Sequence, residues 1–228
     1  MRTRWIRRVS RLGLALVLCS VAWVAFYRFV NPPITPLMVI RWVEARAAGR
    51  PAAIDRQWRP LAALGTALPR AVIASEDARF FAHHGVDLEE VERSRLYNER
   101  HHGRRVRGAS TISMQCARNV FLWPGRSWLR KAVELYFTGL IELLWSKQRI
   151  LEVYLNVIEW GDGVYGAEAA AEHWFHVPAA RLGARQAALL AAMLPSPRRS
   201  DPTVPSAYLS RQARVVEARA ARTRLPAR

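Results

Sequence analysis

A basic N-terminus followed by a long apolar run is the feature that most constrains this chain. Residues 2–11 hold five arginines and no acidic residue, and residues 12–30 are apolar apart from Gly13, Ser20 and Arg28. As a helix, that run would be about 28 Å long, close to the thickness of the hydrocarbon core of a bilayer. Aromatic residues collect toward its far end, as in an interfacial belt: Trp23, Phe26, Tyr27 and Phe29. The pattern predicts a single transmembrane anchor.

The charge asymmetry of this segment also predicts its orientation. Arginine-rich flanks stay in the cytoplasm, so the chain after residue 30 is expected outside the cytoplasmic (inner) membrane, in the periplasm or its equivalent. A cleaved signal peptide would need small residues at a cleavage site, and residues 28–31 (RFVN) do not offer them. A lipoprotein signal would need a small residue before Cys19, where the chain has Leu18.

Composition divides the chain into five segments. Residues 1–11 are a basic cytoplasmic tail and residues 12–30 are the anchor. Residues 31–60 are a stalk or membrane-proximal segment, because Asn31-Pro32-Pro33 breaks the helix, with a short helix expected near 37–48. Residues 61–200 are one globular domain. Residues 201–228 are a basic helix or tail, expected to be solvated or to lie on anionic lipid.

The globular domain is predicted to be mainly α. Apolar residues recur at helical spacing between Gly- and Pro-marked turns, and no segment shows convincing strand alternation. Asp87, Ser110 and Ser127 stand where N-caps are expected. Helices are predicted over 69–82, 87–100, 110–119, 127–144, 147–158, 167–175 and 185–194.

Net charge indicates the class of ligand. The chain carries +17 at pH 7, which favours nucleic acid, anionic lipid headgroups or a phosphorylated substrate. Its only lysines are Lys131 and Lys147, since the other basic residues are arginines. The two cysteines, Cys19 and Cys116, lack metal-ligand spacing and say little about the compartment.

Glu76 is a carboxylate on an apolar stripe. On the helix expected over 69–82, it lies one turn from Val72 and from Phe80. Apolar surroundings raise the pKa of a carboxyl group, as a general acid or base requires. The alternative is an ordinary surface ion pair with Arg79.

Two other patterns carry possible chemistry. Glu134 follows Arg130 and Lys131 within one turn, which by spacing alone is an ordinary helix ion pair. Ser110 and Thr111 follow Gly108 at a helix start, whose free N–H groups can bind phosphate. Gln115 and Arg118 point along the same side of that helix. The histidines form no metal-binding motif of the HExxH kind, so no protein metal site is predicted.

Five motifs together resemble the peptidoglycan glycosyltransferase family, in family order and at family spacing. They are Glu76-Asp77-x-x-Phe80-x-x-His83-x-Gly85; Gly108-x-Ser110-Thr111-Ile112-x-x-Gln115-x-x-Arg118-Asn119; Arg130-Lys131-x-x-Glu134; Lys147-x-x-Ile150-Leu151-Glu152-x-Tyr154-Leu155-Asn156; and Gly163-Val164-Tyr165-Gly166-Ala167-Glu168-x-Ala170-Ala171. No transpeptidase domain like that of class A penicillin-binding proteins follows, so the resemblance is to the monofunctional biosynthetic members. The chain departs from the family pattern at Ala109, Met114 and Arg118, which leaves the rate more open than the reaction type.

The resemblance implies a lysozyme-like large lobe, a small lobe touching the membrane, and transfer chemistry. Members polymerise lipid II into glycan strands. The acceptor 4-hydroxyl attacks the anomeric carbon of the donor with inversion, and undecaprenyl pyrophosphate leaves. The expected partners are lipid II, the lipid-linked glycan, the membrane, and possible cell-wall synthesis or division proteins, with no nucleic acid. A divalent ion (Mg or Mn) is compatible with the family, although this sequence does not derive it.

The resemblance also implies residue roles. Glu76 is the general base, and Glu134 is a second catalytic carboxylate that helps hold the pyrophosphate through a cation or a metal ion. The pyrophosphate side comprises Ser110, Gln115, Arg118, Arg126, Arg130 and Lys131. Other expected substrate-binding residues are Asp77, Phe80, His83, Thr111, Lys147, Glu152 and Asn156. The basic loop 101–108 is expected to order over the donor phosphates.

Three rival readings stay open at this point. A lysozyme-like hydrolase or lytic transglycosylase would protonate a glycosidic oxygen and use water or an internal hydroxyl as nucleophile. A membrane-anchored, non-catalytic partner of the wall-synthesis machinery would tolerate Ala109 and Arg118. A nucleic-acid binder would explain the charge, but not the external topology or the acidic motif.

Overall fold

The computed structural model describes residues 2–102, 107–125 and 127–226, and within them the fold is mainly α, as predicted. The helices are α1 (Arg2–Phe29), α2 (Pro36–Ala47), α3 (Ala67–Glu76), α4 (Leu88–Arg100), α5 (Ile112–Phe121), α6 (Trp128–Leu144), α7 (Lys147–Val157), α8 (Ala167–Phe175), α9 (Ala184–Met193) and α10 (Ala207–Ala220). Short 3-10 helices cover Leu61–Leu64 (η1) and Ala179–Arg181 (η2).

A small sheet, which the sequence did not predict, joins the segment before the domain to residues 159–165. Strand β3 (Val164–Tyr165) lies between β1 (Asp55–Arg56), with which it is parallel, and β2 (Glu159–Gly161), with which it is antiparallel. A turn at residues 162–163 links β2 to β3. These strands are too short to show alternation, so the pattern gave no signal for them.

Most helix boundaries follow their capping residues. The Asp87 side chain accepts from Glu90 N at the start of α4, and Ser127 accepts from Arg130 N at the start of α6, as predicted. Helix α8 has the predicted bounds. Helix α5 is capped by Thr111 and not by Ser110, so that boundary was wrong by one residue.

Helix α3 ends earlier than predicted. It stops at Glu76 and not at residue 82, because Asp77 leaves the helical conformation (φ −162°, ψ 76°) and turns its side chain toward the start of α5. Phe80 is therefore not one helical turn from Glu76, although its side chain is fully buried. The helical-wheel argument for Glu76 was wrong in this part, whereas Val72 does lie on α3 and is buried.

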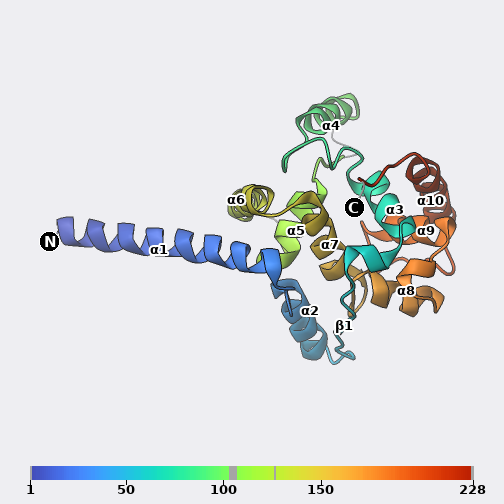
Figure 1. Ribbon diagram of the computed structural model, residues 1–228, viewed down its shortest axis with the longest axis horizontal. Helices are drawn as coiled ribbons and strands as arrows, with labels where there is room; N and C mark the ends of the chain where they lie inside the picture. The colour runs from blue at the N-terminus through green and yellow to red at the C-terminus, as the bar shows by residue number, and fades with distance from the viewer. Residues whose placement is uncertain (1, 103–106, 126, 227–228) are drawn as a thin grey trace.

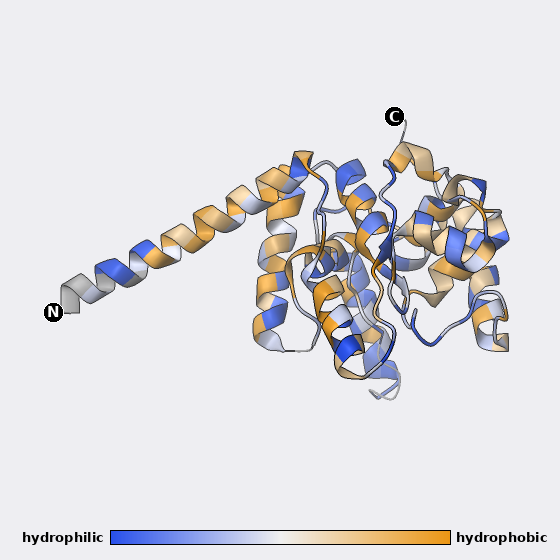
Figure 2. Ribbon diagram, turned by 90° about the horizontal axis from the view of Figure 1, so that it is seen from below, coloured by the Kyte–Doolittle hydropathy of each residue, from blue (hydrophilic) through white to orange (hydrophobic). Residues whose placement is uncertain are grey.

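Helix α1 extends far beyond the rest of the molecule (Figure 1). Its segment Ser10–Phe29, with mean hydropathy 1.9, is long and apolar enough to cross a membrane, and Figure 2 shows the apolar residues along it. The end of α1 is fixed to the domain: Trp145 Nε1 donates to Val24 O at 2.8 Å, and the ring of Trp23 lies 5.2 Å from that of Phe121. The predicted anchor is thus a helix that packs on α5 and α6.

The core surrounds α7. Helix α5 packs on α6 and α7, and α3 packs on α9 and α10, so α7 and α8 lie between two groups of helices (Figure 1). The largest fully buried side chains include Trp160, Tyr154 and Tyr165, from α7 and the small sheet. The two groups meet at the end of α3 and the start of α5, where Glu76 and Asp77 lie.

Helix α10 is part of this core. Leu209, Ala213 and Val216 are buried against α9 and α3. The predicted basic helix exists, but one face of it is packed and not solvated. Figure 1 places it at the end of the molecule opposite α1, which does not favour contact with the bilayer that α1 would cross. The five-segment division of the chain stays a prediction.

Gly85 gives a test of the packing between the segment that follows α3 and helix α6. Its φ is +93°, and a Cβ there would lie 2.9 Å from Thr138 Cγ2. We expect Gly85→Ala to lower the free energy of unfolding by about 1–3 kcal/mol, because it adds both backbone strain and a contact that is too close. Thermal denaturation in detergent measures this.

Gly139 is the matched control, one residue from Thr138 on α6. A Cβ at Gly139 meets no atom within 4 Å, so Gly139→Ala should raise the stability by about 0.5–1 kcal/mol. Equal effects of the two substitutions would contradict the role given to Gly85.

Candidate active site

Glu76 lies between two clefts. One, of about 380 Å³, is lined by Gln115, Arg118, Arg130 and Tyr154 among others. The other, of about 180 Å³, is lined by Glu76 itself together with Ser75, Asp77, Ser110 and Thr111. The side chain of Gln115 bonds to that of Glu76, so the walls of the two clefts meet at this pair.

Hydrogen bonds fix the orientation of the Glu76 carboxylate. Gln115 Nε2 donates to Glu76 Oε2 at 2.8 Å, and Ser75 Oγ donates to Oε1 at 3.4 Å. The buried Tyr154 hydroxyl donates to Gln115 Oε1 at 3.0 Å, which turns the amide N–H groups toward Glu76. Tyr154 belongs to a quoted motif, but no role was predicted for it. Its spacing of three and four residues from Leu151 and Ile150 is typical of a core position and does not indicate a contact with the site.

The electrostatics of the site favour a proton acceptor. Burial raises the pKa of Glu76 above the usual value for a glutamate, and nearby Asp77 adds to that effect. The hydrogen bonds from Gln115 and Ser75 and the charge of Arg118 act in the opposite direction. The net pKa is raised, as the sequence predicted. Arg79 pairs with Asp87 and Glu89, so the alternative of a surface pair between Glu76 and Arg79 is not found.

Glu134 has a different environment. Its side chain is 1% exposed, and its two oxygens lie 2.8 Å from Arg130 Nη1 and 2.6 Å from Lys131 Nζ. Arg130 also lines the larger cleft. The predicted ion pairs are present, and because Glu134 is buried, removal of either cation would leave its charge poorly compensated. Glu134 therefore holds two cations in place.

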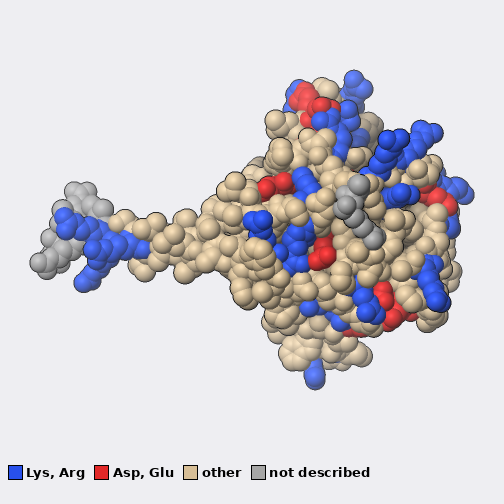
Figure 3. All heavy atoms as spheres, viewed as in Figure 1, with Lys and Arg blue, Asp and Glu red and all other residues tan. Residues whose placement is uncertain are grey.

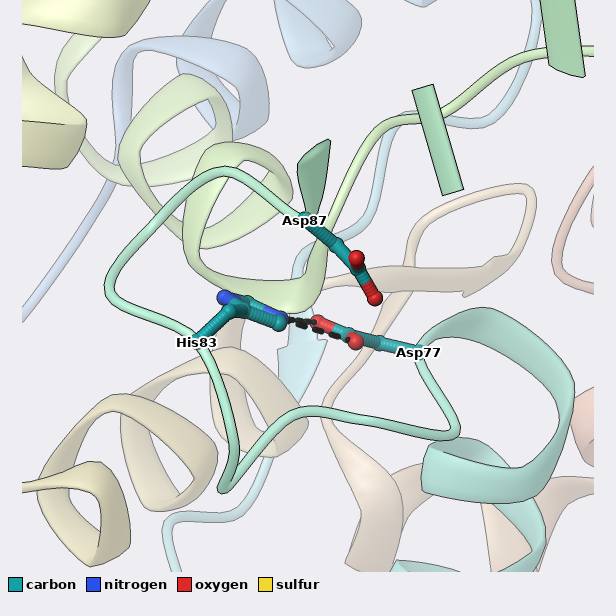
Figure 4. Close-up of side chains that lie close together, drawn as sticks. All are labelled: Asp77, His83 and Asp87. Atoms are coloured by element: carbon teal, nitrogen blue, oxygen red, sulfur yellow. Dashed lines mark hydrogen bonds and ion pairs between the residues drawn. The ribbon is translucent and has the colours of Figure 1, made fainter. Parts of the chain in front are cut away.

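Asp77 and His83 pack together, directly after Glu76 in the chain (Figure 4). His83 Nε2 lies 2.9 and 3.0 Å from the two oxygens of Asp77, and Ile112 N donates to Asp77 Oδ2 at 3.0 Å. Both side chains are buried. Asp77 thus fixes the start of α5 relative to the end of α3. The sequence had expected both residues to contact substrate, and the structure gives them internal partners.

Asp77, His83 and Asp87 also have the spacing of metal ligands, with ligand atoms within 4.8 Å of one another. Both carboxylates and His83 Nε2 are already paired, however, and only the buried His83 Nδ1 has no hydrogen-bond partner among the described residues. Asp87 accepts from Glu90 N and lies 3.4 Å from Arg79 Nε, and Asp77 bonds to His83 and to a backbone N–H. A metal ion would have to displace these contacts and face a guanidinium.

Phe80 and Lys147 belong to a second internal cluster. Lys147 Nζ lies 4.5 Å from the centre of the fully buried Phe80 ring and 2.7 Å from Glu142 Oε1. Ser113 Oγ donates to the same oxygen. Sequence reasoning missed Glu142, although a carboxylate inside the apolar stretch 140–144 is the signal that had drawn attention to Glu76.

Glu152 and Asn156 hold the chain segment that precedes the domain. Asn156 accepts from Arg59 N at 2.8 Å and donates to Arg59 O at 2.9 Å, and Glu152 accepts from Leu61 N at 2.8 Å. Asn156 is fully buried. These motif residues, also expected to bind substrate, bond to the protein's own backbone.

The remaining predicted residues divide between the clefts and the interior. Ser110 lines the smaller cleft, and Thr111 caps α5 and donates to Gly85 O at 2.5 Å. Arg126 and residues 103–106 of the basic loop lie outside the described residues. Positive φ among described non-glycine residues occurs at His102 and His176, so Ala109 does not strain the backbone.

Comparison with known proteins identifies the family. The family model described as Transglycosylase matches residues 44–220. The chain belongs to the transglycosylase family. A protein of Rhodospirillum centenum with the name biosynthetic peptidoglycan transglycosylase is 54% identical over 218 residues, which are 96% of this chain and 91% of that protein.

Two further relatives carry the same name. One, from Caulobacter vibrioides, is 49% identical over 93% of this chain and 92% of its own length. The other, from Pseudomonas entomophila, is 51% identical over 91% of this chain and 87% of its own length. The resemblance drawn from the five motifs and the expected lysozyme-like helical class are thereby confirmed.

The hydrogen bond from Gln115 gives a test of the site's electrostatics. Because this bond stabilises the ionised carboxylate, Gln115→Ala should raise the pKa of Glu76 further. A carbon NMR titration of labelled glutamate measures it. Gln148→Ala, at an exposed position of α7, is the control and should leave the pKa of Glu76 unchanged. A lowered or unchanged pKa in Gln115→Ala would refute this account.

The internal role of Asn156 is tested against a matched asparagine. Asn156→Ala should lower the free energy of unfolding by about 2–3 kcal/mol, since it removes a fully buried amide and leaves the part-buried N–H and C=O groups of Arg59 unpaired. Asn98 bonds the N–H and the C=O of Arg107 in the same way, but at an exposed position.

Water can replace the bonds of Asn98, so we expect Asn98→Ala to cost about 1 kcal/mol or less. Thermal denaturation of both variants makes the comparison. If Asn156→Ala kept full stability, an internal role for this residue would be excluded.

Proposed function

We propose that this chain is a peptidoglycan glycosyltransferase that polymerises lipid II, with Glu76 as its general base. One observation carries the proposal: in a chain of the transglycosylase family, Glu76, a carboxylate with a raised pKa, lies where two clefts meet, and Arg118 lines the larger of them. Two clefts on either side of one base suit a reaction that joins two large substrates.

The proposed reaction needs one proton acceptor. A Glu76 oxygen accepts the proton of the acceptor's 4-hydroxyl as that oxygen bonds to the anomeric carbon of the donor. The bond from this carbon to the pyrophosphate oxygen breaks on the opposite side, so the configuration inverts. The raised pKa of Glu76 makes it a better acceptor than an ordinary surface carboxylate, and Gln115 holds the oxygen in place.

The leaving group needs positive charge more than a proton. Arg118 and Arg130 line the larger cleft, and Lys131 lies beside Arg130 on α6. Glu134 neutralises only part of this charge, since one carboxylate faces two cations. Preorganised cations stabilise the charge that develops on a departing pyrophosphate. This suits transfer from a pyrophosphate better than the hydrolysis of a glycosidic bond, which requires a protonated acid.

A protein-bound divalent ion does not fit these residues. Both oxygens of Glu134 are already bonded to cationic side chains, and the cluster of Asp77, His83 and Asp87 is internally paired. We therefore derive no step through a metal ion. The arginines and Lys131 are the groups to which we assign the pyrophosphate.

The location follows from α1 in this proposal. We place Ser10–Phe29 in the cytoplasmic membrane as a single span, with the catalytic domain outside the cytoplasm. Exposed apolar side chains on α6, next to α1, support a small lobe that touches the bilayer: Trp128 (91% exposed), Leu129 (71%) and Leu143 (79%). Association with cell-wall synthesis or division proteins is part of the proposal that rests on resemblance alone.

Strand synthesis by the purified full chain in detergent, with labelled lipid II and a divalent ion, tests the function. Glu76→Gln should lower the rate by about 10²–10⁴-fold, because glutamine cannot accept the proton. Glu92→Gln, on the exposed face of α4, is the control and should retain activity.

The other outcomes identify the rivals. Cleavage of finished sacculi would indicate a lysozyme-like hydrolase. Failure of a folded wild type that binds lipid II to make polymer would indicate a non-catalytic partner. Full activity of folded Glu76→Gln would exclude Glu76 as the base.

A further inference from the structure

The side chain of Arg219 on α10 lies at the edge of the smaller cleft, which Glu76 lines and which is called the Glu76 cleft below. It lies in the last turn of α10 and lines the cleft of about 180 Å³ together with Glu76 and Ser110. It also lines two shallow grooves outside this cleft, one of them with Ile73 of α3 and with Ala78 and other residues that follow the end of α3. Arg219 therefore stands where the cleft opens onto the surface. No motif drew attention to it, because it lies far beyond the last motif in the sequence.

Arg219 is also the arginine of this cleft whose charge is free. The cleft is lined by four arginines, Arg79, Arg93, Arg107 and Arg219. Arg79 pairs with Asp87 at 3.4 Å, and Arg107 pairs with Glu90 at 2.7 Å, to which Arg93 is also close. The side chain of Arg219 has no ion pair or hydrogen bond with any residue in the described part of the chain. An unpaired guanidinium at the mouth of a cleft can bind an anion.

The position of Arg219 is fixed by packing. Arg185 of α9 pairs with Glu217 of α10 at 3.7 Å and donates to Ser210 O at 3.3 Å. Val216 and Ala213, also on α10, are buried in the core. Helix α10 therefore holds Arg219 at the cleft as part of the core and not as a flexible tail.

The position of Arg219 in the molecule limits which anionic group of the substrate can reach it. Helix α10 lies at the end opposite the apolar helix α1, and Figure 3 shows basic side chains gathered over that end. The pyrophosphate of the donor is assigned above to the larger cleft, which Arg118 and Arg130 line and Arg219 does not. The anionic groups of lipid II that can extend away from the bilayer are the carboxylates of its peptide stem.

We propose that Arg219 binds a carboxylate of the peptide stem of the sugar unit held in the Glu76 cleft. Arg222, which follows three residues later and lines with Arg219 the groove beside α3, extends this basic edge along the path of the stem. Arg219 is a substrate-binding residue that contributes to affinity and to the choice of stem, and it takes no part in proton transfer. The inference rests on the proposed polymerisation of lipid II.

Two substrates and three proteins test it. Strand synthesis is measured with lipid II whose stem carboxylates are free and with lipid II whose stem carboxylates are amidated. The proteins are the wild type, Arg219→Ala and Arg214→Ala, all as full chains in detergent. Arg214 is an exposed arginine of the same helix that does not line the Glu76 cleft, so it controls for net charge and for helix stability.

The expected result is specific to the carboxylates. Arg219→Ala should raise KM for the free-carboxylate substrate about fivefold with little change in kcat, as for the loss of one exposed charge-assisted contact. On the amidated substrate Arg219→Ala and wild type should have the same KM. Arg214→Ala should resemble wild type on both, and Arg219→Lys should recover part of the affinity.

Each other outcome overturns the assignment. An equal KM for wild type and Arg219→Ala on both substrates would show that Arg219 does not bind substrate. An equal rise on both substrates would place a phosphate, and not a carboxylate, on Arg219. A rise that disappears when anionic lipid is omitted from mixed micelles would make it a membrane contact. Absence of polymer from the wild type would instead refute the proposed function itself, which keeps the two failures distinct.

Discussion

The buried carboxylate of Asp77 is the contact on which the site depends. By accepting from Ile112 N and from His83, it ends α3 at Glu76 and fixes the first turn of α5 against it. Gln115 lies on the next turn of α5, so the same junction places its amide 2.8 Å from Glu76. A helix that continued to residue 82 would have carried Glu76 on a regular face, without this partner. The Asp77 side chain thus holds the end of α3 and the start of α5 together, and this gives the Glu76 carboxylate a defined orientation.

The carboxylates of the domain divide by the partners that they have. Glu134, Glu142 and Glu152 each face a cationic side chain and hold it in place. Glu76 is held by neutral donors, Gln115 and Ser75, and feels Arg118 only through its charge. A neutral donor orients a carboxylate with less stabilisation of its ionised form than a bonded cation would give. This difference, and not burial alone, separates the base from the structural carboxylates.

The sequence predicted the class, the long apolar helix at the N-terminus and most helix positions, because caps and periodicity are local signals. It did not predict the end of α3, since the bond that ends it joins Asp77 to a residue far along the chain. The motifs did not separate contact with substrate from packing. Phe80, Lys147 and Asn156 stand in signature positions, yet all three have internal partners. Lys147 lies over the buried Phe80 ring and pairs with a carboxylate, and Asn156 bonds to a backbone segment. Arg219 shares a cleft with Glu76 only through the packing of α10, which no spacing reveals.

Keeping Glu76 ionised in a buried site lowers the stability of the folded chain, and other contacts must offset that loss. Its folded-state pKa is raised, so its contribution to stability is fully present below the pKa of the unfolded chain and is lost as pH rises through the folded value. At neutral pH, where the base must be ionised, the site is therefore less stable than it would be with a neutral side chain. The internal hydrogen bonds of Asp77 and Asn156 do not involve the Glu76 proton. They therefore stabilise the folded chain whether or not Glu76 is ionised. The motif residues whose hydrogen bonds are internal are thus part of the same function, because they allow a buried carboxylate to stay charged.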